Sequence, residues 1–310
     1  MKLATYRHGD NESYGVAGDD AIVDVPALWP DGPQSLAAAL AAGPDALKRI
    51  GDLTADAAGR AVPLGDVVLR APVPCPPKVF GLAGNYVEHI REGGGGKDLP
   101  DDPRRHTTPR PFLMPGTTVI GPNDQIPWPD FSDRVDHEIE LAIVMGARAK
   151  SISPEAAAQY IAGYTIANDI SARSVTHVRG RSERAKDGFF DWLHGKWADG
   201  FCPTGPWVVT ADEIGDPGRL DMLLTVNGEV RQKANTSQMI FNVYEVVSFL
   251  SHIVTLTPGD LIATGTVQGV GAASGKLLQG GDVITCRIEG IGELTNTLDD
   301  PPDGFYAPCE

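Results

Sequence analysis

The segment Val135–Gly146, VDHEIELAIVMG, alternates acidic and apolar residues before it becomes purely apolar. This pattern predicts a β-strand that enters a hydrophobic core. Successive side chains of a strand point to opposite faces, so we expect Asp136, Glu138 and Glu140 on one face. The strand would therefore carry a row of three carboxylates at its beginning.

Three carboxylates on one face repel one another unless a positive charge lies among them. A hard divalent cation such as Mg²⁺, Mn²⁺ or Ca²⁺ is suited to a cluster of oxygen ligands. A second strand-like run, IAGYTIAN at 161–168, ends just before Asp169, which is placed to add a ligand from a neighbouring strand. The alternative is a solvated acidic strand edge, which is common in proteins.

Composition narrows the classes of partner and location. The chain has 310 residues, with 26 lysines and arginines against 41 aspartates and glutamates, a formal net charge of −15. Without a long basic run, neither nucleic acid nor an anionic membrane surface is expected as a partner. The four cysteines lack CxxC spacing, which argues against a zinc site or a disulfide framework. No signal-peptide-like or membrane-spanning apolar run is seen, so a cytoplasmic location is expected.

The chain divides into two predicted parts. Residues 1–70 suggest a small α+β domain, and a proline-rich connector at 71–78 leads into a larger, β-rich domain over 71–310. In that domain Asn227-Gly228 predicts a hairpin turn. Helices are expected within 85–92, 153–163 and 239–254, with Thr236 or Ser237 as the N-cap of the last.

The segment 85–110 is glycine-rich, charged and broken by prolines, which is typical of a lid beside an active site. His89 and Glu92 lie three residues apart at its start. On a helix this spacing lets the carboxylate accept the imidazole N–H and raise the basicity of the other ring nitrogen. The alternatives are a flexible insertion without a role and an ordinary surface pair.

Two cationic residues could contact the substrate or could simply be exposed to solvent. Lys196 lies in an aromatic and glycine-rich passage and could donate to an oxyanion or a substrate carboxylate, whereas a lone lysine is more often exposed. Arg173, four residues beyond Asp169, is equally ambiguous. The chain lacks the GxGxxG, GxSxG and HExxH motifs, which disfavours nicotinamide enzymes, serine hydrolases and zinc proteases.

Six motifs in this order resemble the fumarylacetoacetate hydrolase family over about residues 72–298. They are GLAGNYVEHIRE, VDHEIELAIVMG, IAGYTIANDISAR, GKWADGFCPTGPWVVT, VNGEVRQKANTSQMIF and LTPGDLIATGTVQGVG. The resemblance implies a β-rich α+β fold, a mixed β-roll or sandwich of the fumarylacetoacetate hydrolase C-terminal type, with a small N-terminal domain. It also implies a homodimer.

The resemblance also assigns roles to residues of this chain. Glu138 and Glu140, from the ExE motif, and Asp169, from the NDxSAR motif, would be the metal ligands, which leaves Asp136 outside the ligand set. His89 and Glu92 match a catalytic HxxE dyad, and Lys196 matches a catalytic lysine. Arg173 and Thr266 match residues close to the substrate.

Departures from the family pattern concern the substrate more than the metal site. Many members have Lys-Pro where this chain has Met114-Pro115, and TGTP where it has TGTV at 264–267. Members that cleave fumarylacetoacetate carry a glutamine in the segment that follows the SAR motif, where this chain reads SVTH.

These features predict a Mg²⁺-dependent hydrolase, with Mn²⁺ or Ca²⁺ as possible replacements, that cleaves a C–C bond. The expected substrate is a small oxo acid of the β-diketo, acylpyruvate or 2,4-diketo-3-deoxy sugar acid type. The same metal site would also suit a decarboxylase or an isomerase of a 2-oxo acid. A non-catalytic binding protein would be expected to lack the ligands or the dyad, and this chain has both.

Overall fold

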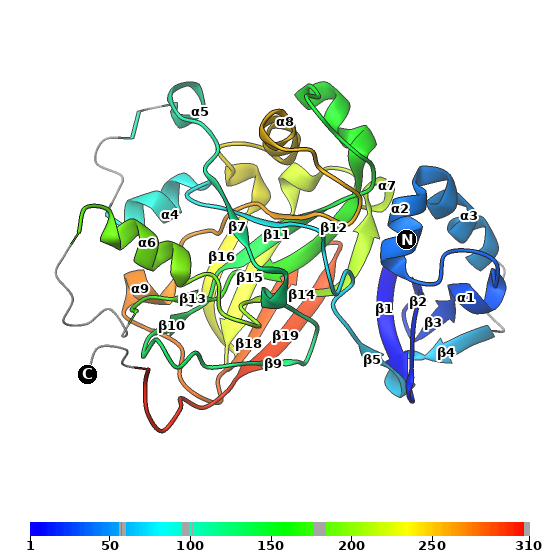
Figure 1. The fold of residues 1–310 in the computed structure, drawn as a ribbon, viewed down its shortest axis with the longest axis horizontal. Helices are drawn as coiled ribbons and strands as arrows, with labels where there is room; N and C mark the ends of the chain where they lie inside the picture. Colours follow the sequence, from blue (N-terminus) through cyan, green and yellow to red (C-terminus); the bar gives the residue numbers. More distant parts are fainter. Residues whose placement is uncertain (56, 58–59, 95–98, 101, 176–183, 307–310) are drawn as a thin grey trace.

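The computed structural model describes residues 1–55, 57, 60–94, 99–100, 102–175 and 184–306. The predicted lid at 85–110 therefore lies partly outside the described residues, including half of its glycine run. Within the described part of the chain, no helix is both long and apolar enough to cross a membrane. Figure 1 shows the N-terminal elements beside a larger body that contains the remaining strands.

Most strands form one mixed sheet. Among the described residues, twelve strands pair in the order β4–β3–β2–β1–β14–β12–β11–β17–β6–β7, with β5 added to β1 and β8 to β14. Its strands are β1 (Lys2–His8), β2 (Asn11–Ala17), β3 (Ala21–Asp24), β4 (Ala61–Pro63), β5 (Val68–Leu69), β6 (Val79–Leu82), β7 (Pro111–Met114), β8 (Val119–Ile120), β11 (Ile139–Met145), β12 (Ile161–Asn168), β14 (Cys202–Thr210) and β17 (Leu261–Ala263).

A second sheet packs against the first and contains five strands in the order β16–β15–β18–β19–β9. Asn227 and Gly228 both have positive φ, as a two-residue type I′ turn requires, and they join β15 to β16 as predicted. A short two-stranded ladder pairs β10 with β13. These strands are β9 (Gln125–Ile126), β15 (Asp221–Val226), β16 (Glu229–Asn235), β18 (Val283–Ile288), β19 (Gly292–Leu298), β10 (Val135–Asp136) and β13 (Ser171–Ala172).

Helices cover the sheets. They are α1 (Val25–Leu28), α2 (Leu36–Ala42), α3 (Pro44–Thr54), α4 (Val87–Glu92), α5 (Pro103–His106), α6 (Asp187–His194), α7 (Ala211–Ile214), α8 (Val243–Ile253) and α9 (Gly271–Ser274). Single 3₁₀ turns occupy Leu64–Asp66, Gly116–Thr118, Pro217–Arg219 and Thr236–Gln238, and the predicted helix at 153–163 is a longer 3₁₀ segment, Pro154–Tyr160, that runs into β12.

The predicted start of the last helix is wrong. Asn242, not Thr236 or Ser237, caps α8, because its side chain accepts from the amides of Tyr244 and Glu245. Glu245 completes a capping box by accepting from the amide of Asn242.

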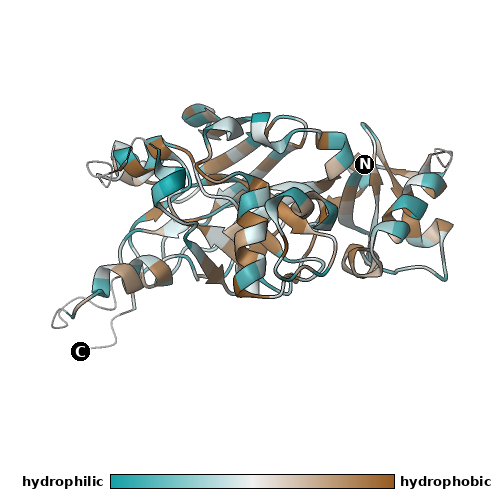
Figure 2. Cartoon of the chain, turned by 90° about the horizontal axis from the view of Figure 1, so that it is seen from above, coloured by the Kyte–Doolittle hydropathy of each residue, from teal (hydrophilic) through white to brown (hydrophobic). Residues whose placement is uncertain are grey.

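β11 is buried on both faces, which explains its continuous apolar sequence. Leu141 and Ile143 point into the core between the two sheets. Ala142 and Val144 point into a second core that the N-terminal helices help to close. Figure 2 shows the hydrophobic residues concentrated in the interior strands, while the outlying helices carry hydrophilic bands.

The N-terminal strands continue the main sheet. β1 pairs antiparallel with β14, with Lys2 opposite Val209 and Leu3 opposite Val208. Leu3 also packs in the same apolar cluster as Val144 of β11. The division of the chain into domains at about residue 70 stays a prediction.

Candidate active site

Three acidic side chains meet where β11 begins and β12 ends. The two strands are antiparallel with Ile139 opposite Asn168, so the register brings Glu138, Glu140 and Asp169 to the same end of the pair. One oxygen of each carboxylate lies within 4.8 Å of the other two. Glu138 is 5% exposed, and Glu140 and Asp169 are 1% exposed, so the alternative of a solvated acidic edge is wrong here.

Burying these carboxylates together opposes their ionisation. Burial raises the pKa of Glu140 well above its ordinary value, and the charges of Asp169 and Glu138 raise it further. Burial, with the charge of Glu138, raises the pKa of Asp169 to about 6, although Lys196 acts in the opposite direction. At Glu138 burial also opposes ionisation, but the charges of Lys196 and Arg173 outweigh it and lower the pKa.

Lys196 is the cation at the centre of the cluster. Its Nζ donates to Glu138 Oε2 and Asp169 Oδ2 at 2.8 Å each, and to Ser171 Oγ at 2.7 Å. The side chain is 2% exposed, so the alternative of a surface lysine is wrong. Burial alone would lower its pKa, but the charges of Asp169 and Glu138 outweigh burial and raise it, which keeps the ammonium protonated.

The three carboxylates have the chemistry of a divalent-cation site. Oxygen ligands of this kind are those that Mg²⁺, Mn²⁺ and Ca²⁺ accept. Asp169 Oδ1 is buried and has no hydrogen-bond partner in the described part of the chain, although buried carboxylate oxygens are normally paired. Glu138, Glu140 and Asp169 therefore fit a metal that would bind this oxygen and offset the repulsion within the cluster.

Asp136 lies apart from these three residues. The chain leaves strand geometry between β10 and β11, which ends the alternation that the sequence suggested. Asp136 accepts from the amides of Gly271 and Ala272 at 2.6 and 2.9 Å and from Arg173 Nε at 2.9 Å. Arg173 Nη2 also donates to Glu138 Oε1 at 2.5 Å. Arg173 thus holds a carboxylate of the cluster, and its contact with substrate stays a prediction.

The His89–Glu92 pair lies on α4, as the sequence suggested. Glu92 Oε1 is 2.9 Å from His89 Nδ1, and Glu92 Oε2 accepts from the amide of Gly269 at 2.7 Å. An ionised carboxylate only accepts hydrogen bonds, so the proton of a neutral His89 is on Nδ1 and Nε2 keeps its lone pair. The backbone of the β17–α9 connection therefore fixes the carboxylate that orients the histidine.

His89 and two carboxylates of the acidic cluster, Glu138 and Asp169, line one small pocket of about 100 Å³. Phe112 of β7 and Trp192 of α6 form another part of its wall, with their rings in edge contact at 5.0 Å. Thr266 also lines it and donates its hydroxyl to the carbonyl of Ile139 at 2.9 Å. Sequence reasoning missed Phe112 and Trp192, because no specific signal marks them and α6 itself was not predicted.

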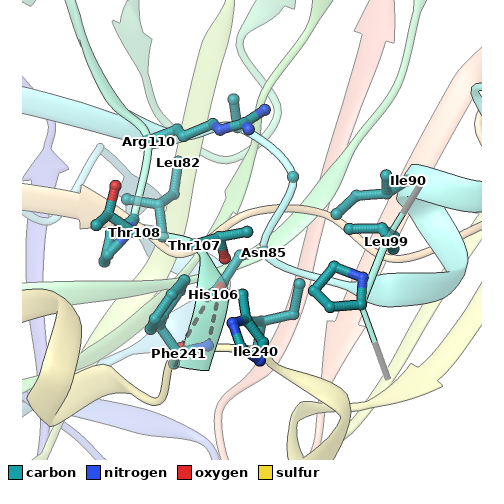
Figure 3. Close-up of a pocket in the computed structure, with 14 residues that line it drawn as sticks. Leu82, Asn85, Ile90, Leu99, His106, Thr107, Thr108, Arg110, Ile240 and Phe241 are labelled. Carbon is teal, nitrogen blue, oxygen red and sulfur yellow. Dashed lines mark hydrogen bonds between the residues drawn. The ribbon is translucent and has the colours of Figure 1, made fainter. Parts of the chain in front are cut away.

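A larger cavity of about 400 Å³ lies beside this pocket, between α4, residues 99–100 and 106–110, and the segment that precedes α8 (Figure 3). Leu82, Ala83 and Gly84 line both spaces. Asn85, in the loop between β6 and α4, donates from Nδ2 to the carbonyl of Phe241 at 3.0 Å. Its Oδ1 accepts from the amide of Phe241 at 2.9 Å. The two spaces are therefore neighbours that share the loop between β6 and α4.

The family model described as fumarylacetoacetate (FAA) hydrolase C-terminal matches residues 78–299. The chain belongs to this family. Its sheet-rich α+β fold is of the family's C-terminal type, which confirms the predicted fold class. The chain is 39% identical over 239 residues to a bovine protein named oxaloacetate tautomerase FAHD2A, mitochondrial, with 76% of this chain and 71% of that protein covered.

Solved structures add two relatives with different activities. One is a maleylpyruvate hydrolase from Sphingobium sp. SYK-6 in complex with manganese(II) and pyruvate, with a TM-score of 0.75, 31% identity, and 97% and 100% of the two chains covered. The other is a 5-carboxymethyl-2-hydroxymuconate delta-isomerase from Mycobacterium smegmatis, with a TM-score of 0.72, 34% identity and the same coverage. The fumarylacetoacetate hydrolase family thus includes hydrolases, isomerases and tautomerases.

Proposed function

We propose that this member of the family hydrolyses a C–C bond in a small acylpyruvate-type acid, such as a 2,4-diketo acid or a 2,4-diketo-3-deoxy sugar acid. The observation that carries the proposal is that His89, paired with Glu92, lines the same pocket as Glu138 and Asp169. A histidine oriented by a carboxylate, with Nε2 free to accept a proton, is suited to act as a general base toward water.

Glu138, Glu140 and Asp169 would hold a divalent cation, for which we propose Mg²⁺, with Mn²⁺ or Ca²⁺ as replacements. When bound, the cation would polarise a carbonyl of the oxo acid and neutralise negative charge that develops on its oxygen. The manganese(II) and pyruvate in the related maleylpyruvate hydrolase structure support a divalent cation and an oxo acid substrate.

The residues of the chain would then perform hydrolysis as follows. His89 Nε2 takes a proton from water while the water oxygen attacks the acyl carbonyl carbon, and Glu92 stabilises the imidazolium that forms. Lys196 donates to the new oxyanion; its three N–H groups are already used, so one of their bonds must be exchanged. When the tetrahedral intermediate collapses, the C–C bond breaks and its electron pair passes to the methylene carbon of the departing pyruvate. His89 then delivers its proton to this carbon.

A second candidate is isomerisation or decarboxylation of a 2-oxo acid, including keto–enol interconversion of a compact dicarboxylate. The size of the pocket, about 100 Å³, favours a compact substrate. The name of the bovine relative, oxaloacetate tautomerase, points the same way. In this case His89 would move a proton between carbon and oxygen without activating water.

The test is a spectrophotometric panel of acylpyruvates, 2,4-diketo sugar acids and oxaloacetate, each with Mg²⁺ or Mn²⁺ and each repeated with EDTA. We expect His89→Ala to bind Mn²⁺ like the wild type and to lose roughly 10²–10⁴-fold in kcat. His252→Ala, at an exposed histidine on α8, is the matched control and should change neither property.

The outcomes separate the two candidates. Cleavage of a diketo acid that requires metal and His89 supports the hydrolase. Turnover of oxaloacetate alone moves the protein to the isomerase or decarboxylase class. Loss of Mn²⁺ binding together with activity in His89→Ala would contradict the division between base and metal ligands.

A further inference from the structure

The segment Thr264–Ala272, which comprises the connection from β17 to α9 and the first two residues of α9, binds three carboxylates through its backbone. The amide of Gly265 donates to Glu140 Oε2 at 2.6 Å, and the amide of Gly269 donates to Glu92 Oε2 at 2.7 Å. Its last two amides, those of residues 271 and 272, donate to Asp136. The three acceptors come from β11, α4 and β10, so a single segment contacts a metal-ligand candidate, the dyad and the partner of Arg173.

Such a segment positions the carboxylates only if it is itself held in place, and Gln232 of β16 does this. Its Nε2 donates to Thr266 Oγ1 at 3.0 Å and to the carbonyl of Val267 at 2.7 Å. Its Oε1 accepts from the amide of Ile139 at 3.0 Å and lies 3.2 Å from His137 Nδ1. Gln232 is 1% exposed. Its amide oxygen therefore binds the stretch that carries Glu138 and Glu140, and its amide nitrogen binds the segment Thr264–Ala272.

The backbone at Gly269 shows how closely the segment packs on β16. Gly269 has a φ of +104°, and a Cβ built there would lie 2.2 Å from the carbonyl oxygen of Arg231, the residue before Gln232. A residue with a side chain would therefore push the segment away from β16 and move the amide that binds Glu92. Close packing and the Gln232 hydrogen bonds act at the same place.

We infer that Gln232 is a positioning residue that couples the metal ligands to the His89–Glu92 dyad through the segment Thr264–Ala272. It neither lines the pocket nor belongs to the proposed metal ligands, and it acts by fixing the amides that orient Glu140 and Glu92. Removing a group that hydrogen-bonds a metal ligand changes metal affinity by roughly 10–100-fold. Gln232 acts one step further from the ligands, through the segment that carries the Gly265 amide, so we expect an effect at the lower end of this range. This inference rests on the proposed metal site, so its test includes a measurement that needs no metal.

The test compares Gln232→Met with Asn296→Leu. Asn296 of β19 is a matched control, because it is also a buried amide whose nitrogen donates to two backbone carbonyls of a distant loop, at 2.8 and 2.9 Å. Mn²⁺ affinity is measured from the signal of free Mn²⁺ in electron paramagnetic resonance. Hydrogen exchange of peptides covering 264–272 and α4 is measured in metal-free protein.

For Gln232→Met we expect about tenfold weaker Mn²⁺ binding and faster exchange of the amides of Gly265 and Gly269. Asn296→Leu should leave both unchanged. Gln232→Glu is the second variant; it keeps an oxygen toward Ile139 but loses the donor toward Val267, so it should also accelerate exchange in the segment.

Three results would overturn the inference: wild-type Mn²⁺ affinity in Gln232→Met, unchanged exchange in both Gln232 variants, or an equal loss in Asn296→Leu. If the wild type itself binds no Mn²⁺, the proposed metal site fails. The exchange data from metal-free protein still decide whether Gln232 holds the segment.

Discussion

The acidic cluster makes a quantitative prediction for Asp169→Asn in protein freed of metal with EDTA. Asparagine has the size of the protonated aspartic acid and its oxygen can still accept from Lys196. The pKa of Asp169 is raised from 3.8 to about 6, mainly by burial. At about 1.4 kcal/mol per pH unit, this shift means that ionising Asp169 lowers the free energy of unfolding of the wild type by about 3 kcal/mol. The variant does not have this loss.

The sign of the pH dependence follows from the raised pKa. Below pH 3.8 Asp169 is protonated in the folded and the unfolded state, and its contribution to stability is fully present. As pH rises through about 6, the folded state must release the proton and this contribution is lost. The asparagine of the variant would not titrate, so the variant should match the wild type near pH 4 and exceed its stability at pH 7.5.

The assay is urea unfolding at several pH values between 4 and 7.5, with Asp303→Asn as an exposed control. Added Mn²⁺ should remove most of the difference in stability between the wild type and Asp169→Asn at pH 7.5. At a hundred times its Kd it stabilises a protein that binds it by about 2.7 kcal/mol, and it should not stabilise Asp169→Asn. A variant that is less stable than the wild type at pH 7.5 without metal would refute the electrostatic reasoning, because the ion pair with Lys196 would then outweigh the repulsion.

Three further predictions test other parts of the site and fold. Lys196→Met should destabilise the metal-free protein by roughly 3–5 kcal/mol, because it leaves buried carboxylates unpaired, and Mn²⁺ should recover part of this loss in urea unfolding. Glu92→Gln should lower kcat by roughly 10²-fold with unchanged Mn²⁺ affinity, whereas a parallel loss of affinity would place Glu92 at the metal. Asn242→Ala should destabilise the fold by about 1 kcal/mol through the lost α8 cap, while Ser237→Ala should have no effect on the urea midpoint.

The sequence was sufficient to predict features that depend on local periodicity. The unbroken apolar run in β11 follows from burial on both faces, and the hairpin at Asn227-Gly228 follows from the φ values that these residues tolerate. The proximity of Glu138 and Glu140 follows from their spacing of two residues. Placing Asp169 beside them needed the pairing of β11 with β12, which the sequence suggested only as a neighbouring strand.

Features that depend on distant contacts were not predictable in this way. Gln232 lies in EVRQKAN, a polar stretch with the pattern of an ordinary solvent-facing strand, yet it is buried. Its hydrogen-bond partners lie 34 to 95 residues away along the chain, so local sequence does not indicate its burial. Asp136 fits the alternation of the acidic stretch, but a break in the strand sends it to the α9 amides. The α8 start was misplaced because several residues near 236 are acceptable caps, and the Asn242–Glu245 spacing was the better signal.

The balance of charge at the cluster explains why a divalent cation fits it. Asp136 and the three carboxylates of the cluster face two cationic side chains, Lys196 and Arg173, so the total charge of these six groups is −2 when all are ionised. Among the described residues Glu140 has a backbone donor, the amide of Gly265, but no cationic side-chain partner. Asp169 shares Lys196 with Glu138 and leaves its Oδ1 unpaired in the described part of the chain. These are also the two acids whose pKa values are raised. The two negative charges that the side chains do not balance thus arise where ionisation is most difficult. A doubly positive ion bound there would balance them and allow the whole cluster to ionise at neutral pH.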